Sequence, residues 1–104
     1  MITQQQIQDV LHSIIASYEP NKVILFGSMV NDSGANANDI DLILIKPTTL
    51  PKHLRSVELY KLFLKTQIPI DILVYTPNEY DDEIKNNFSF LYKALQNSKV
   101  LYEQ

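Results

Sequence analysis

The 104-residue chain contains no cysteine and only one arginine, Arg55. Without cysteine it can form neither a disulfide framework nor a metal site built from thiolates. Nine lysine and arginine residues stand against twelve acidic ones, so the net charge is −3. A protein with this charge balance offers no basic face to a nucleic-acid backbone. We therefore expect no direct binding of nucleic acid.

The sequence also lacks a targeting segment and a membrane segment. Its first residues do not show the basic-then-apolar pattern of a signal peptide. No apolar run approaches the about 20 residues that span a bilayer. We expect a cytoplasmic protein without membrane contact, in which residues 1–104 form one domain that buries somewhat over ~60% of its unfolded surface.

The apolar patterning predicts four strands and four helical stretches. Thr3 and Gln6 form a capping-box signature at the start of an amphipathic helix over 4–18. Short β-rich apolar runs predict strands at 22–26, 40–45, 70–75 and 100–102. Further helices are predicted over 51–65, from Pro77 onward, and over 90–96. This order predicts the α/β (α+β) class, with a mixed sheet flanked by helices.

Two aspartates at the start of the second predicted strand carry the strongest chemical signal. Asp39 and Asp41 point to one face of a strand, with Cα atoms about 6.5 Å apart. Like charges at this distance repel and raise one pKa, whereas a divalent cation removes that cost. Turn chemistry alone explains Asp39 but not Asp41, which shares a face with Ile43 and Ile45. We therefore favour a Mg²⁺ site with oxygen ligands.

Three further residues complete the candidate site. Asp71 lies in an apolar strand, where a lone carboxylate needs a partner. It is either a polar residue on an edge strand or, as we favour, the third carboxylate of a cup with Asp39 and Asp41. Gly27 and Ser28 follow the first strand and form either a simple turn with a helix cap or, as we favour, a phosphate site. In that second interpretation Gly27 allows close approach and Ser28 starts a helix with exposed N–H groups.

These motifs resemble a known family. The run L-F-G-S at 25–28 is followed after ten residues by D-I-D-L at 39–42, and later by I-D-I-L-V at 70–74 and V-L-Y-E at 100–103. Together they resemble the nucleotidyltransferase superfamily of DNA polymerase beta, most closely its minimal nucleotidyltransferase branch, over nearly the whole chain. The resemblance implies a nucleotidyltransferase-like mixed sheet, two Mg²⁺ ions and ATP as the substrate.

The resemblance also assigns roles to the site residues. Asp39 and Asp41 would bind the ion that carries the triphosphate, and Asp71 would join them on a second ion. Gly27 and Ser28 would hold the β- and γ-phosphates. The chain departs from the branch at Met29, where an arginine usually follows the Gly-Ser pair.

The acceptor is expected to lie on another protein, because 104 residues leave no room for an acceptor domain. Members of the branch that this chain resembles often act as antitoxins that adenylylate a tyrosine of a helical HEPN-type ribonuclease toxin. We therefore expect AMP transfer from ATP to a partner hydroxyl, within a homo- or hetero-oligomer. One alternative is a weakly active protein that neutralises its partner by stoichiometric binding. Another is a small-molecule nucleotidyltransferase completed by dimerisation.

Overall fold

The strands form one mixed, four-stranded sheet. A computed structural model describes residues 2–30 and 39–104 of the chain. In sequence order the strands are β1 (Lys22–Phe26), β2 (Ile40–Ile45), β3 (Ile70–Tyr75) and β4 (Ser98–Glu103). Their order in the sheet is β3-β2-β1-β4; β1 is antiparallel to β2 and β4, while β2 and β3 are parallel. The predicted sheet and its strands are confirmed.

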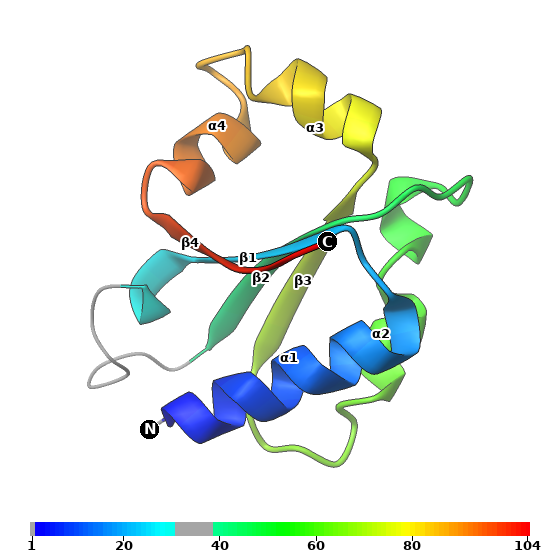
Figure 1. Ribbon diagram of the computed structural model, residues 1–104, viewed down its shortest axis with the longest axis vertical. Coiled ribbons are helices and arrows are strands. Elements are labelled where there is room, and N and C mark those ends of the chain that lie inside the picture. The colour runs from blue at the N-terminus through cyan, green and yellow to red at the C-terminus, as the bar shows by residue number, and fades with distance from the viewer. Residues whose placement is uncertain (1, 31–38) are drawn as a thin grey trace.

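Helices cover both faces of the sheet (Figure 1). One layer contains α1 (Gln4–Tyr18) and α2 (Val57–Lys61), and we call the sheet face beneath it the α1 face. The other layer contains α3 (Pro77–Glu83) and α4 (Phe90–Leu95), which cover the α4 face. Two 3₁₀ turns, η1 (Gly27–Met29) and η2 (Lys52–Leu54), complete the elements. In the part of the chain that is described, no helix has both the length and the apolar character needed to cross a bilayer.

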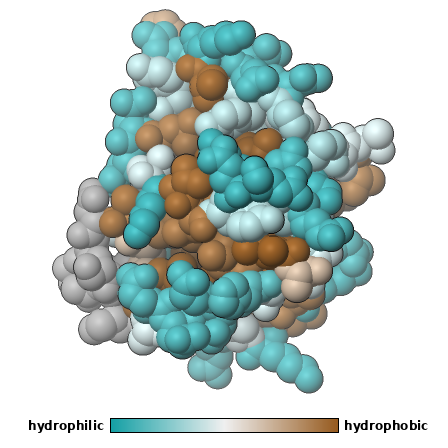
Figure 2. Space-filling view, viewed as in Figure 1, coloured by the Kyte–Doolittle hydropathy of each residue, from teal (hydrophilic) through white to brown (hydrophobic). Residues whose placement is uncertain are grey.

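The α1 face carries the larger buried cluster. Helix α1 begins with the predicted capping box: the Gln6 amide donates to the Thr3 hydroxyl, and the Thr3 amide donates to the Gln6 side chain. The apolar stripe of α1 is buried against alternate residues of the strands, including Val23, Leu25 and Leu44. Figure 2 shows hydrophobic residues gathered between the largely hydrophilic outer surfaces of the two helical layers.

The α4 face carries a smaller cluster, built from the residues that alternate with those of the α1 face. Its buried members are Ile24, Ile43, Ile45, Tyr75 and Leu91. Because side chains alternate along a strand, Asp41 lies on this face with Ile43 and Ile45, and Asp71 lies on it with Tyr75. The α4 face is therefore the one that presents the candidate site.

The predicted long helix over 51–65 is wrong. The structure divides this segment into η2 and the five-residue α2, and only Leu59 of its apolar residues is buried. Between them lies Arg55, 8% exposed, whose guanidinium donates to both Glu79 carboxylate oxygens at 2.6 and 3.1 Å. It also donates to the carbonyl oxygen of Leu50 at 2.8 Å. These contacts fix the chain at Arg55 and interrupt the helix that its apolar spacing suggested.

Both edges of the sheet depart from a regular ladder. On β3, the Ile72 N–H donates to the Tyr60 hydroxyl at 2.7 Å, and the Val74 carbonyl accepts from Arg55 at 3.1 Å. On β4, the partners of β1 shift between Val23 and Ile24, which leaves Leu101 as an extra residue in a bulge. Side chains therefore occupy one edge, and a bulge interrupts the other.

Candidate active site

Three carboxylates meet where β2 and β3 begin. The parallel register places Asp41 directly beside Asp71, and Asp39 immediately precedes β2. One carboxylate oxygen from each of the three residues lies within 4.8 Å of the others. Asp71 is exposed, whereas Asp39 and Asp41 are partly buried. The structure thus brings together the three aspartates singled out from the sequence.

The surroundings of Asp41 change the pKa of its carboxyl group. Partial burial, followed by the negative charges of Asp39 and Asp71 and a hydrogen bond with Asp71, raises the pKa of Asp41 to about 6. A carboxyl group in this position resists ionisation unless a positive charge compensates it. Oxygen ligands of this kind suit Mg²⁺, so the donor set fits the predicted cation.

Gly27 has a structural reason to be glycine. Its φ of +82° is unfavourable for residues with a side chain. A Cβ atom added at this position would lie 2.5 Å from Oδ2 of Asp41. The absence of a side chain at Gly27 therefore makes room for the Asp41 carboxylate, a role that the sequence alone does not reveal.

Ser28 and Met29 follow Gly27 in the same turn but face different surroundings. Ser28 is exposed and lies inside η1, whose N-cap is Phe26, so the expectation that Ser28 starts the helix is wrong. Met29 is 3% exposed and packs in the cluster of the α1 face. The residue that replaces the expected arginine is thus a core residue, packed in the cluster of the sheet face opposite to Asp41 and Asp71.

Sequence reasoning missed an aromatic pair next to the carboxylates. Phe26 is the cross-strand partner of Asp41 and lies on the α4 face. Its ring packs edge-on against Phe90 at the start of α4, with centroids 5.8 Å apart and planes at 82°. Phe90 remains 54% exposed. Two phenylalanines, Phe88 and Phe90, within an otherwise polar stretch were the available signal.

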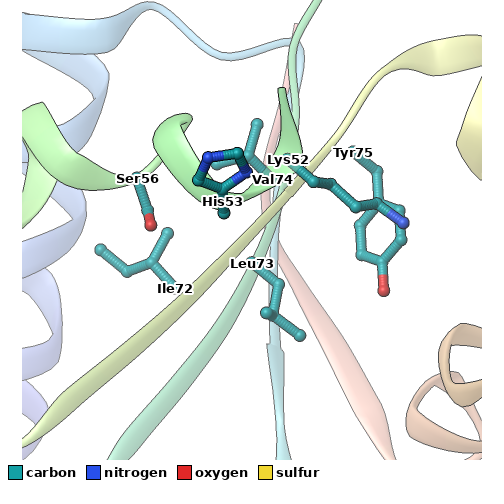
Figure 3. Close-up of a pocket in the computed structure, with 7 residues that line it drawn as sticks. All are labelled: Lys52, His53, Ser56, Ile72, Leu73, Val74 and Tyr75. Carbon is teal, nitrogen blue, oxygen red and sulfur yellow. The ribbon is translucent and has the colours of Figure 1, made fainter. Parts of the chain in front are cut away.

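A cavity of about 330 Å³ lies along β3, beginning after Asp71. Lys52, His53 and Ser56 line it from the segment before α2, opposite side chains of β3 that include Leu73 (Figure 3). Leu73 is 38% exposed and shares its strand face with Asp71. The cavity lining does not include the carboxylates, but it begins at Ile72, the residue that follows Asp71 on the same strand.

Comparison with known proteins supplies the family. A family profile described as polymerase beta, nucleotidyltransferase, matches residues 5–104. The chain belongs to this nucleotidyltransferase family. The resemblance of the sequence motifs had predicted this family. The predicted family is confirmed.

Two solved structures share the fold of this chain. Both are crystal structures of mutants of the toxin–antitoxin MntA–HpeT. The mutant with two aspartate-to-glutamate substitutions is 18% identical, with a TM-score of 0.59, over 99% of this chain and 75% of the other. A tyrosine-to-alanine mutant is 19% identical, also at 0.59, over 100% and 75%. No curated protein sequence matched the chain.

Proposed function

We propose that this protein is a Mg²⁺-dependent nucleotidyltransferase that transfers AMP from ATP to a hydroxyl of a partner protein. In this proposal the partner is a HEPN-type ribonuclease toxin, the acceptor is a tyrosine, and the protein acts as the antitoxin in the cytoplasm. The observation that carries the proposal is the convergence of Asp39, Asp41 and Asp71 in a chain of the nucleotidyltransferase family.

The three carboxylates would hold the cations. One oxygen from each lies within 4.8 Å of the others, and the raised pKa of Asp41 reflects partial burial and then repulsion by Asp39 and Asp71, both of which a bound cation would offset. When bound, Mg²⁺ neutralises the triphosphate and lowers the pKa of an attacking hydroxyl. The proposal assigns Asp39 and Asp41 to the ion that carries the triphosphate, and all three aspartates to the second ion.

The remaining groups would orient the substrates. The acceptor oxygen bonds to the α-phosphorus of ATP while the bond to the α–β bridging oxygen breaks, so AMP stays on the acceptor and pyrophosphate leaves. Asp71 is the exposed member of the cluster, and this exposure supports a role in which it faces the acceptor hydroxyl and receives its proton. Ser28 is exposed beside Gly27 and would contact the β- and γ-phosphates.

The toxin partner is supported by the structural neighbours. MntA–HpeT is named as a toxin–antitoxin, and one of its mutants has glutamate in place of two aspartates spaced as Asp39 and Asp41 are here. This similarity gives a reason to test a toxin as the acceptor and to test the two aspartates first.

A docking surface for the partner surrounds the cavity of Figure 3. Leu50, Leu54 and Val57, which neighbour the lining residues in sequence, are each 42–48% exposed. Lys52 and His53 line the cavity itself, and Lys52 is already paired with Glu83 at 3.3 Å, so the cavity offers polar groups to the partner without a free positive charge from Lys52. Because Tyr60 and Arg55 occupy backbone groups of β3, we propose that the partner inserts side chains from a helix and does not add a strand.

Met29 favours a second function, stoichiometric neutralisation without catalysis. Methionine carries no charge, and this side chain is buried in the core, so it cannot neutralise a phosphate at Gly27 and Ser28. The chain's single arginine is bound to Glu79, away from the carboxylates. In this second function the protein would bind its partner by the same surface but transfer little or no AMP.

One experiment separates the two functions. The protein would be incubated with the protein encoded beside it, ATP and Mg²⁺, and the partner's mass measured. Catalysis predicts a mass increase equal to AMP that Asp41→Ala abolishes, while Asp81→Ala, an exposed acid on α3, leaves it unchanged. If no adduct forms and neutralisation of the toxin survives Asp41→Ala, the enzymatic proposal is wrong and stoichiometric binding stands.

A further inference from the structure

We infer that Phe90, held by Phe26, is the stacking surface for the base of the nucleotide. This inference rests on the proposed function, because it places the base relative to a triphosphate held at the carboxylates. It assigns a binding role to an exposed ring that neither the core nor the proposed chemistry uses.

The position of the pair follows from the sheet register. Phe26 and Asp41 are directly opposite each other on β1 and β2 and share the α4 face. Neighbouring strands lie about 4.8 Å apart, so the Phe26 ring begins one strand spacing from the carboxylates. Phe90 packs against Phe26 with ring centroids 5.8 Å apart, so it is linked to the carboxylates through the ring of Phe26. A nucleotide whose triphosphate lies at the carboxylates thus has an exposed aromatic ring near it on the same face of the sheet.

Phe90 is exposed but held in a fixed position. Its neighbour Leu91 is fully buried in the cluster of the α4 face. Ser89 caps α4 by accepting from the Tyr92 amide at 3.0 Å, and its hydroxyl donates to the Glu83 carbonyl at 2.8 Å. The perpendicular contact with Phe26 then orients the ring. An exposed apolar ring that is held in this way is preorganised for a flat ligand.

A nucleobase is the ligand that this chemistry fits. Bases stack on aromatic side chains through their π-faces, and all bases have such a face. We therefore expect the Phe90 ring to strengthen binding of a nucleotide over binding of its phosphates alone. Since stacking is tolerant of base identity, we expect only modest discrimination among the four nucleotides.

Binding of two probes tests the inference. Calorimetry in Mg²⁺ would measure the affinities of α,β-methylene-ATP, which cannot transfer AMP, and of inorganic tripolyphosphate, which has no base. Phe90→Ala should weaken the ATP analogue roughly ten-fold and leave tripolyphosphate unchanged. Phe90→Leu, which keeps an apolar side chain against Phe26 without a π-face, should lose the same selectivity, and Phe90→Trp should retain it.

Phe88→Ala is the matched control. Phe88 is 83% exposed and two residues away, but its ring is not part of the pair, so both probes should bind this variant as they bind the wild type. If Phe90→Ala and Phe90→Leu bind the analogue as tightly as the wild type, the inference is overturned while the proposed function stands. If the wild type binds neither probe, both are overturned.

Discussion

The two faces of the sheet differ in what they leave exposed. On the α1 face, α1 and the strands enclose a cluster in which Ile14, Val23 and Leu44 are fully buried. On the α4 face, Asp41 and Asp71 lie at the start of β2 and β3, and the first ring of α4, Phe90, stays half exposed. The difference indicates that one face chiefly stabilises the fold while the other keeps its acids and an aromatic ring accessible.

The largest expected effect is a loss of unfolding free energy from a substitution on the α1 face. Ile14→Ala removes a side chain with no exposed surface and should lower the free energy of unfolding by about 2–5 kcal/mol, because a cavity remains in the core. Urea denaturation would measure it. On the other face, Phe90→Ala should cost less than about 1 kcal/mol because much of the ring is already in solvent. Equal losses for both variants would contradict the division between the faces.

A charge placed in the same core should have the next largest effect. Met29→Arg restores the residue usual in the related branch, but the side chain at this position is buried. We expect a loss of roughly 2–4 kcal/mol in unfolding free energy, because the core offers the guanidinium no partner. Ser28→Arg, one residue earlier and exposed, should fold as the wild type does. Stable folding of Met29→Arg together with stronger ATP binding would show that the side chain can turn toward the phosphates.

Gly27→Ala should affect stability and the site together. The positive φ costs about 1–2 kcal/mol for a residue with a side chain, and the new Cβ would displace the Asp41 carboxylate. The rise in melting temperature on adding Mn²⁺ should therefore shrink more than the stability loss alone explains. Ala16→Gly, at an exposed position in α1, gives a backbone change of similar cost without touching the site. An unchanged Mn²⁺ response in Gly27→Ala would contradict the close approach of Gly27 to Asp41.

The smallest effect concerns pH, and here the substitution should raise the melting temperature, whereas the earlier ones lower stability. The pKa of Asp41 is raised to about 6 in the folded protein, above the about 3.9 of an unfolded aspartate. Its contribution to stability is therefore present below pH 4 and lost as pH rises through 6. Without divalent cations, Asp41→Asn should melt at a higher temperature than the wild type at pH 8, and this advantage should disappear by pH 4.

Adding Mn²⁺ at pH 8 should reverse that order, since the cation stabilises only the protein that retains the carboxylate. Melting curves with and without Mn²⁺ would measure both parts. A wild-type curve that millimolar Mn²⁺ leaves unchanged would contradict the metal site.

The strands and the acidic cluster were predictable because their signals are local. The apolar runs fixed the four strands, and Asp41 and Asp71 stood out as acids among buried neighbours. Their meeting depends on the parallel pairing of β2 with β3, a register that the apolar runs alone do not encode.

The features that sequence analysis did not predict depend on long-range contacts that no local pattern encodes. The apolar spacing over 51–65 suits a helix, but the ion pair from Arg55 to Glu79, 24 residues apart, overrides it. This hydrogen-bonded pairing also lowers the pKa of Glu79 to about 2. Likewise, the burial of Met29 under the α1 face and the contact of Phe26 with Phe90 both join elements distant in sequence.

The treatment of the sheet edges has a consequence for the protein on its own. An unprotected edge strand is a template on which further chains can add as β-strands and aggregate. Here the Tyr60 hydroxyl and the Arg55 guanidinium occupy backbone groups of β3, and the bulge at Leu101 interrupts β4. We therefore expect the addition of further strands to be disfavoured at both edges of this sheet.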